Sequence, residues 1–382
     1  MLLKHQPRSQ VKSLNIKSRV LPLILTISFV ALISANRAGA QFKVIDLVSD
    51  QPGVAMLRDT SLVNAWGISL SGTSAFWVSN NGTGTSTLYS VNATTNVPTK
   101  VPLTVTIPGA GNVTGQVFNG GTGFNGDAFL FVSEDGTVSG WRGALGTHAE
   151  TLVTGSPNNS YKGSARALIG GNAYLYAANF KTGNIDVFKG TAAAPNLTGN
   201  FTDPGLPSGF APFNIQNLGG KLYVTYAKVG PTGDDVAGAG NGFVSVFDTN
   251  GNFLGRVGSN GTLNSPWGLA LAPASFGALA GDLLVGNFGD GTINAFDLGT
   301  NAFEGQLTNA DGNPLAIDGL WGLTVGNNGA GGSSNKLYFS AGPNDESHGL
   351  FGVLAAVPEP SSYAMLTAGL LPTWLALKRR KR

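Results

Sequence analysis

Apolar and aromatic residues in the central part of the chain occur in short runs separated by turn-forming residues. Examples are the run Phe76-Trp77-Val78-Ser79-Asn80 and, after a glycine-rich turn, Gly242-Phe243-Val244-Ser245-Val246-Phe247. Short runs rich in aromatic and β-branched residues, bounded by Gly, Asn and Asp, predict β-strands. Between residues 41 and 357 no segment keeps a helical period for more than about two turns. This region is therefore expected to be all-β.

One run in each unit belongs to an internal repeat. Trp66-Gly67-Ile68-Ser69-Leu70 recurs as Trp267-Gly268-Leu269-Ala270-Leu271 and as Trp321-Gly322-Leu323-Thr324-Val325. Weaker copies start at Gln116, Ala165 and Pro212, so six units follow one another at intervals of about 47 to 54 residues. Units of this length with three or four strands each are typical of β-propeller blades.

A β-sandwich and a parallel β-helix are the alternative folds. Sandwiches rarely repeat a three-part pattern six times, and the coils of a β-helix are much shorter than these units. We therefore predict a six-bladed β-propeller, of the NHL or gluconolactonase-like type, over residues 41–356.

The two ends of this region predict how the ring of blades closes. The sixth unit lacks an outer strand, because only residues 349–354 remain before the C-terminal tail. Residues 42–48 read as a strand that precedes the first unit and has no blade of its own. Because unpaired strand edges would otherwise be exposed at the seam, we expect residues 42–48 to pair antiparallel with residues 349–354.

The N-terminal segment has the three parts of a secretory signal peptide. Residues 1–19 carry cations and no acid, residues 20–34 are almost entirely apolar, and Ala38-Gly39-Ala40 is a small-residue cleavage pattern. A membrane anchor is the alternative, but about 15 apolar residues are fewer than the roughly 20 that a spanning helix needs. We expect cleavage after Ala40, which would make the protein an exported one.

The C-terminus combines Pro358-Glu359-Pro360, an apolar stretch over residues 363–377 and a basic cluster over residues 378–382. This order resembles the PEP-CTERM sorting signal, and the resemblance covers residues 357–382. It implies recognition by an exosortase-type membrane enzyme, cleavage near Pro358-Glu359-Pro360 and transient membrane insertion of a short C-terminal helix whose basic end stays cytoplasmic. A permanent transmembrane helix is the alternative, although Pro372 and the short length disfavour it. The expected location is the cell envelope, the cell surface or the extracellular matrix.

Charge changes the picture once these tails are set aside. They hold 11 of the 23 Lys and Arg residues but only one acid, Glu359, so the central region carries a net charge of −8. The overall isoelectric point near 8.7 therefore comes from the tails. No electrostatic case for nucleic acid binding remains.

Several segments of the central region carry a second resemblance: Asn80-Asn81-Gly82-Thr83-Gly84-Thr85-Ser86-Thr87-Leu88, Tyr161-Lys162-Gly163, Ala211-Pro212-Phe213-Asn214-Ile215-Gln216-Asn217, Asp234-Asp235-Val236-Ala237-Gly238, Asn287-Phe288-Gly289-Asp290-Gly291 and Gly342-Pro343-Asn344-Asp345. They resemble a family of uncharacterised bacterial propeller-like proteins that often carry the same sorting tail. The resemblance runs through nearly the whole length and implies the propeller fold without an assigned reaction.

Polar residues end the second strand of successive units and are expected to ring one mouth of the central channel: Asn80, Glu134, Asn179, Tyr226 and Asn287. Their oxygen atoms could hold Ca²⁺, which takes about six to eight oxygen ligands. Gluconolactonase-like propellers, which the fold resembles, use a comparable ring. The alternative is a turn role, because Asn tolerates left-handed backbone geometry.

Two acidic loops add candidate ligands for a cation or a substrate. Residues 228–242 contain Asp234 and Asp235, and residues 342–349 contain Asp345, Glu346 and His348. A solvated polar loop is the alternative in each case.

Familiar enzyme signatures are absent from the sequence. There is no Gly-x-Ser-x-Gly elbow, His-Glu-x-x-His motif or P-loop, and without Cys there is no zinc-thiolate site or cysteine nucleophile. Gly121-Thr122-Gly123-Phe124-Asn125-Gly126 fits the dinucleotide pattern, but a strand follows where a helix is required. Trp66, Trp267 and Trp321 could form a carbohydrate-stacking platform, yet their equivalent strand positions favour core packing between adjacent blades.

Two functions from different classes remain. The favoured one is an exported surface or matrix binding module that presents its loops to a polysaccharide or a surface protein. The alternative is a metal-dependent hydrolase or lactonase of propeller type, with its site at the channel mouth.

Overall fold

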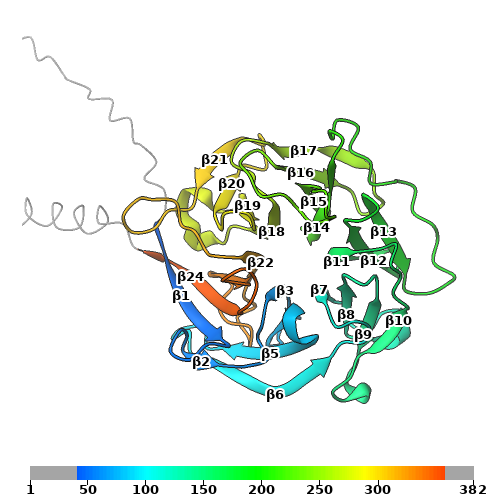
Figure 1. The fold of residues 1–382 in the computed structure, drawn as a ribbon, viewed down its shortest axis with the longest axis horizontal. Coiled ribbons are helices and arrows are strands. Elements are labelled where there is room, and N and C mark those ends of the chain that lie inside the picture. Colours follow the sequence, from blue (N-terminus) through cyan, green and yellow to red (C-terminus); the bar gives the residue numbers. More distant parts are fainter. Residues whose placement is uncertain (1–40, 358–382) are drawn as a thin grey trace, which may run out of the picture. The chain divides into compact units, whose positions relative to one another are not determined.

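The computed structural model describes residues 41–357, which form six antiparallel sheets arranged around a central axis (Figure 1). Each sheet is one blade, and its first strand lies nearest the axis. The six-bladed β-propeller predicted from the sequence is confirmed. The segments 1–40 and 358–382, with the expected signal peptide and sorting signal, lie outside the described residues.

The blades follow the repeat in chain order. Blade 1 contains β3 (Ala65–Ser69), β4 (Phe76–Asn80), β5 (Thr85–Val91) and β6 (Pro98–Thr106), and blade 2 contains β7 (Val113–Phe118), β8 (Phe129–Ser133), β9 (Val138–Trp141) and β10 (Glu150–Val153). Blade 3 has three strands, β11 (Tyr161–Ile169), β12 (Asn172–Asn179) and β13 (Asn184–Lys189).

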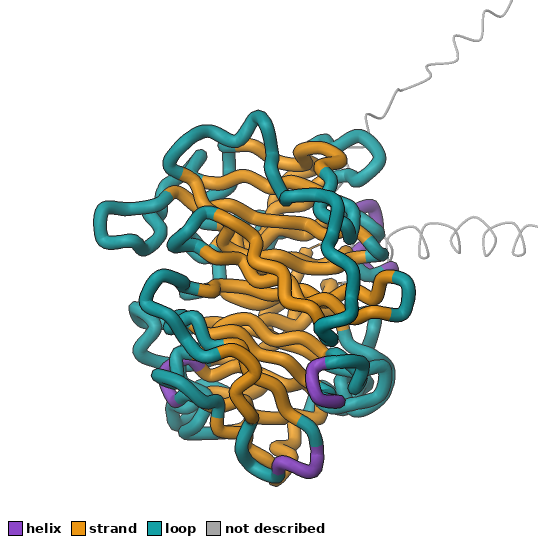
Figure 2. The backbone as a smooth tube through the Cα atoms, turned by 90° about the vertical axis from the view of Figure 1, so that its right-hand side faces the viewer, coloured by secondary structure: helices purple, strands orange, loops and turns teal. Residues whose placement is uncertain are grey.

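Blades 4 and 5 again have four strands each. Blade 4 contains β14 (Phe210–Leu218), β15 (Lys221–Lys228), β16 (Gly242–Phe247) and β17 (Phe253–Ser259), and blade 5 contains β18 (Pro266–Leu271), β19 (Leu283–Asn287), β20 (Ile293–Phe296) and β21 (Phe303–Gln306). In the side view the strands form the body of the disc and the loops gather on its faces (Figure 2).

Blade 6 closes the ring with strands from both ends of the described chain. To β22 (Leu320–Val325), β23 (Leu337–Ala341) and β24 (Leu350–Val357) it adds β1 (Gln41–Ser49) and, outermost, the short parallel β2 (Leu57–Arg58). Strand β1 pairs antiparallel with β24 from Gln41 opposite Val357 to Ser49 opposite Leu350. The predicted closure is therefore confirmed, with a pairing longer than expected.

Helical structure among residues 41–357 is restricted to short 3₁₀ turns, η1 (Asn81–Thr83), η2 (Phe124–Gly126), η3 (Gly143–Leu145) and η4 (Ala274–Leu279). None of the helices in this range has the length and apolar character needed to cross a membrane. The dinucleotide-like pattern ends in the turn η2, and strand β8 follows it from Phe129, as the sequence indicated.

Every inner strand has an irregular register at the same point, where a β-bulge turns one side chain out of the ladder. The six equivalent residues are Trp66, Thr114, Lys162, Phe213, Trp267 and Trp321. The next residue is glycine in all blades except blade 4. A Cβ atom on these glycines would lie 2.0–2.7 Å from an atom of the following blade. In blade 4 the position is Asn214, whose side chain donates to the main-chain oxygen of Trp267 at 2.7 Å.

Candidate functional site

An aromatic cluster fills the axis of the propeller at the end where the inner strands begin, which we call the entry face. The rings of Trp66 and Trp321 stack with centroids 3.6 Å apart, and Trp267 lies edge-on to both at 6.1 and 5.8 Å. Phe288 stacks on the far side of Trp321 at 3.9 Å. All three tryptophans are at most 4% exposed. Their expected core role is confirmed. The contacts of Trp321 with Trp66 and with Trp267 join adjacent blades, and the Trp66–Trp267 contact joins blades 1 and 5 across the axis.

A polar network covers this aromatic cluster. The side-chain oxygen of Asn64 accepts hydrogen bonds from the indole N–H groups of Trp66 and Trp321 at 2.9 and 3.2 Å. Its amide nitrogen donates to Glu346 Oε2 at 2.5 Å and to Asn81 Oδ1 at 3.3 Å. Indole N–H groups can only donate, and the Asn64 oxygen accepts from both of them. Asn64 thereby links the buried rings to Glu346 and, through Asn81, to Glu134.

The charge at the centre of the entry face belongs to Lys162, which occupies in blade 3 the bulge position that Trp occupies in three other blades. Its ammonium group forms an ion pair with Glu134 and lies 5.5 Å from the centroid of the Trp66 ring. The other oxygen of Glu134 accepts from the Asn81 amide at 3.1 Å. The Lys162 side chain is only 8% exposed, so loss of Glu134 would leave a nearly buried cation without its partner.

Two further carboxylates lie within electrostatic range of Lys162. Burial raises the pKa of Glu346, and the hydrogen bond from Asn64 opposes that rise. Burial also raises the pKa of Asp235, while the nearby Lys162 charge lowers it. Together with Glu134 these residues make the centre of the entry face acidic around one buried cation.

Backbone strain is concentrated beside this network. Asn64 has φ of 48°, and three consecutive residues in the loop after β23, Asn344, Asp345 and Glu346, have φ of 58°, 52° and 62°. Left-handed geometry is costly for residues with a Cβ atom and is retained mainly where surrounding contacts require it. This loop thereby turns Glu346 inward to Asn64 and leaves Asp345 exposed to solvent.

The three asparagines predicted as ring ligands hold their own turns together. Asn80 donates to Thr85 and Thr87 in the hairpin it begins. Asn179 and Asn287 each use their side-chain oxygen to accept a main-chain N–H from the loop entering the same blade. All three are fully buried. Their amide groups are therefore engaged in the protein. None of the three has positive φ, so they support the turns through side-chain hydrogen bonds and not through the left-handed geometry that the turn interpretation assumed.

The predicted acidic ligands lie apart from these asparagines. Asp234 is exposed at the tip of its loop and accepts from the Thr232 hydroxyl at 3.2 Å, whereas Asp235 points inward. Within residues 41–357, no group of three or more His, Asp or Glu side chains could hold a metal ion. Calcium binding at the mouth stays a prediction.

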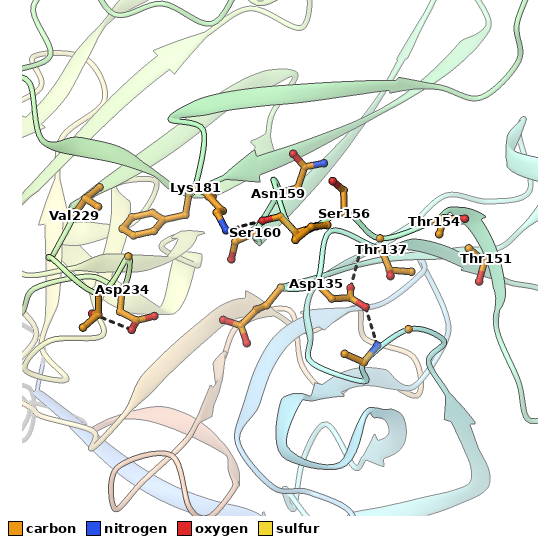
Figure 3. Close-up of a pocket in the computed structure, with 18 residues that line it drawn as sticks. Asp135, Thr137, Thr151, Thr154, Ser156, Asn159, Ser160, Lys181, Val229 and Asp234 are labelled. Atoms are coloured by element: carbon orange, nitrogen blue, oxygen red, sulfur yellow. Dashed lines mark hydrogen bonds between the residues drawn. The ribbon is translucent and has the colours of Figure 1, made fainter.

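An open cleft of about 940 Å³ lies beside the acidic centre, over the entry-face loops of blades 2, 3 and 4 (Figure 3). Thr and Ser hydroxyl groups are the most frequent polar groups in its lining, and Asp135, Asn159, Lys181 and Asp234 are the other polar residues labelled in the figure. Asp135 is fixed, since it accepts the main-chain N–H groups of Ala110 and Thr137 at 2.7 and 2.8 Å. The cleft is thus a concave surface with a rigid acidic wall and many donors and acceptors.

Several residues of this site could not be identified from the sequence. Lys162 occupies the same repeat position as the three tryptophans, but in sequence only the glycine that follows it indicates this equivalence. Asn64 and Asn81 look like ordinary turn residues, and their contacts run to Glu346 and Glu134 in other blades. The shared Xaa-Gly pair at all bulges but that of blade 4 is the signal that could have identified Lys162.

Comparison with known proteins extends the picture. No family model matches the chain. Two uncharacterized proteins of Acanthamoeba polyphaga mimivirus are each 33% identical to it, one over 338 residues that cover 83% of this chain and 81% of the relative. The other match spans 344 residues, 85% of this chain and 89% of the relative. These relatives are viral, whereas we expected a bacterial family.

Among solved structures, an α-L-arabinofuranosidase of Fusarium graminearum in complex with arabinobiose has a similar fold. Its TM-score is 0.51 with 12% sequence identity, and the match covers 82% of this chain and 97% of that chain. At this identity the likeness supports the propeller fold and nothing more specific.

Proposed function

Because the chain belongs to the same family as the two mimivirus proteins, whose names assign no reaction, we propose a function from its own geometry. The protein is a binding module that holds a segment of polysaccharide in the cleft on the entry face. The observation that carries this proposal is the cleft itself, about 940 Å³ in volume, whose lining brings together hydroxyl, amide, ammonium and carboxylate groups.

The chemistry of the lining fits a sugar. Each sugar hydroxyl can donate and accept, so recognition requires many side chains that do the same, and Thr, Ser and Asn supply them here. The volume is at the upper end of about 300–1,000 Å³ for small-ligand sites, which leaves room for several linked rings. The open shape lets a polymer enter without a chain end.

A panel of soluble polysaccharides, screened by affinity electrophoresis and measured by calorimetry, tests this proposal. The double variant Lys181→Ala/Asp234→Ala removes two exposed charged groups of the cleft and is expected to weaken binding about tenfold or more. The matched control Lys221→Ala/Asp311→Ala removes one exposed charge of each sign away from the cleft and should bind like the parent. A silent panel, or equal affinity in both double variants, would reject the proposal.

A metal-dependent hydrolase or lactonase is the second candidate, because the charges of Glu134 and Asp235 lie close enough to act on Glu346 at the mouth. The ion pair of Glu134 with Lys162 counts against it, since a metal would have to compete with the ammonium group. Calcium titration by calorimetry separates the two candidates. Stoichiometric calcium binding together with lactone hydrolysis would favour the enzyme.

We also propose that the protein is exported and then sorted at the cell envelope by an exosortase-type enzyme. The fold is compatible with both expected cleavages. Removal of residues 1–40 leaves β1 whole, because its first paired residue is Gln41, and a cut near Pro358-Glu359-Pro360 leaves β24 whole, because it ends at Val357.

The intact mass of the protein recovered from the cell surface or medium tests both cuts at once. We expect a chain that begins at Gln41 and ends near residues 358–360. A mass that retains residues 1–40 would contradict export by a cleaved signal peptide, and a mass that retains residues 361–382 would contradict sorting.

A further inference from the structure

A second cavity opens at the opposite end of the channel, where the inner strands end. It has a volume of about 380 Å³ and is lined by residues from the inner strands of all six blades. Trp267 of the aromatic cluster contributes to its lining from the axis. The cavity therefore lies on the other side of that cluster from the acidic centre and the cleft.

The lining has one charged side chain, Arg166 of β11, and no carboxylate. Its Nε donates to Asn119 Oδ1 at 3.3 Å, and its two terminal nitrogen atoms have no hydrogen-bond or ion-pair partner within residues 41–357. Burial lowers the pKa of Arg166. A guanidinium group presents its terminal N–H groups in a fork that matches the two oxygens of a carboxylate or phosphate.

Two hydroxyl groups in the same lining are also without partners. The side chains of Ser69 and Ser164 are in residues only 7% exposed, and neither hydroxyl makes a hydrogen bond with the part of the chain that the structure describes. Ser164 and Arg166 are two residues apart on β11, so their side chains leave the strand on the same face. A buried hydroxyl without a partner destabilises the protein, and a ligand in the cavity would remove that cost.

From this cavity, its single positive charge and its two unpartnered buried hydroxyls, we propose a binding site for a small oxyanion, either the carboxylate of an organic acid or inorganic phosphate. The Arg166 fork binds the anion. Ser69 and Ser164, whose oxygen atoms have less than 1 Å² of accessible surface in the free protein, donate to the anion after rotation about their Cα–Cβ bonds. The amide group of Gln216 lines the same space and can contact the rest of the ligand. Because the surrounding domain carries a net charge of −8, general electrostatic attraction does not explain anion binding here.

Calorimetry on the full chain with glucuronate, inorganic phosphate and uncharged glucose tests the site. We expect heat with at least one of the anions and none with glucose, and the anion that binds identifies the source. Arg166→Gln should weaken binding about tenfold or more, as expected for loss of a charge-assisted hydrogen-bond pair. The control Arg58→Gln, at an exposed arginine on β2, should bind like the parent.

Ser164→Ala keeps the test decisive if Arg166→Gln does not fold. It removes an unpaired hydroxyl, so the melting temperature should stay constant or rise, while anion affinity falls about threefold to tenfold for one lost hydrogen bond. The Lys181→Ala/Asp234→Ala variant of the cleft should keep full anion affinity, which separates this site from the polysaccharide proposal. No heat with either anion, or unchanged affinity in Ser164→Ala, would overturn the inference.

Discussion

Deletion of residues 42–48 is expected to lower the melting temperature by more than about 10 °C or to abolish the cooperative transition. The deletion removes most of β1 and therefore the ladder that joins it to β24, worth about 1 kcal/mol net per hydrogen bond. It also removes the burial of Phe42, Leu47 and Val48, at about 1.5–3 kcal/mol for each large apolar side chain. Thermal unfolding followed by circular dichroism measures the effect.

Two point variants keep this prediction testable if the deleted chain does not fold. Phe42 is 1% exposed and its ring lies 4.4 Å from that of Phe276 in the loop after β18, so Phe42→Ala should cost about 3–5 kcal/mol. Lys43 is the next residue on the same strand and is exposed, so Lys43→Ala should change stability by less than about 0.5 kcal/mol. Similar melting curves for both variants would contradict closure of the ring through β1.

Gly67→Ala is expected to destabilise the propeller by about 1–3 kcal/mol or more, because it forces two blades apart. A Cβ atom at this position would lie 2.6 Å from the main-chain oxygen of Thr114 and 3.0 Å from the main-chain nitrogen of Gln116, both in blade 2. Main-chain atoms cannot move aside as a flexible side chain can. Chemical denaturation of parent and variant gives the loss of unfolding free energy.

Gly72→Ala is the matched control in the turn that follows the same strand. A Cβ atom there would have nothing within 4 Å, and the residue does not have positive φ. Alanine should therefore be neutral or stabilise by about 0.4–1 kcal/mol through the unfolded state. Equal effects of the two substitutions would show that the glycine after the bulge is not needed for close approach of the inner strands.

The architecture could be predicted because each blade repeats the same local requirements. Trp66-Gly67, Trp267-Gly268 and Trp321-Gly322 mark three inner strands, since a bulged aromatic residue fills the axis and the glycine admits the next blade. The closure could also be predicted, because a strand without a blade and a blade without an outer strand occur in one chain. The three-stranded blade 3 was not foreseen, since residues 190–209 simply lack a regular pattern.

The site was less predictable because its residues interact across blades. Lys162 replaces an aromatic residue on the axis, and nothing near it in sequence indicates that Glu134 of blade 2 will be its partner. Whether Asp345 or Glu346 points inward to the site depends on three successive residues with left-handed backbone geometry. Contacts with neighbouring residues, and not local preference, maintain this geometry. The ring asparagines were assigned from position alone, and the side-chain oxygens of Asn179 and Asn287, which a cation would need, accept main-chain N–H groups instead.

A crystal structure of the protein with the tightest-binding oligosaccharide is the most direct test of the proposed function. The account predicts sugar density in the cleft over blades 2, 3 and 4, in contact with Lys181 and Asp234 and beside the Lys162–Glu134 pair. Sugar bound only elsewhere on the propeller, with this cleft filled by solvent, would contradict it.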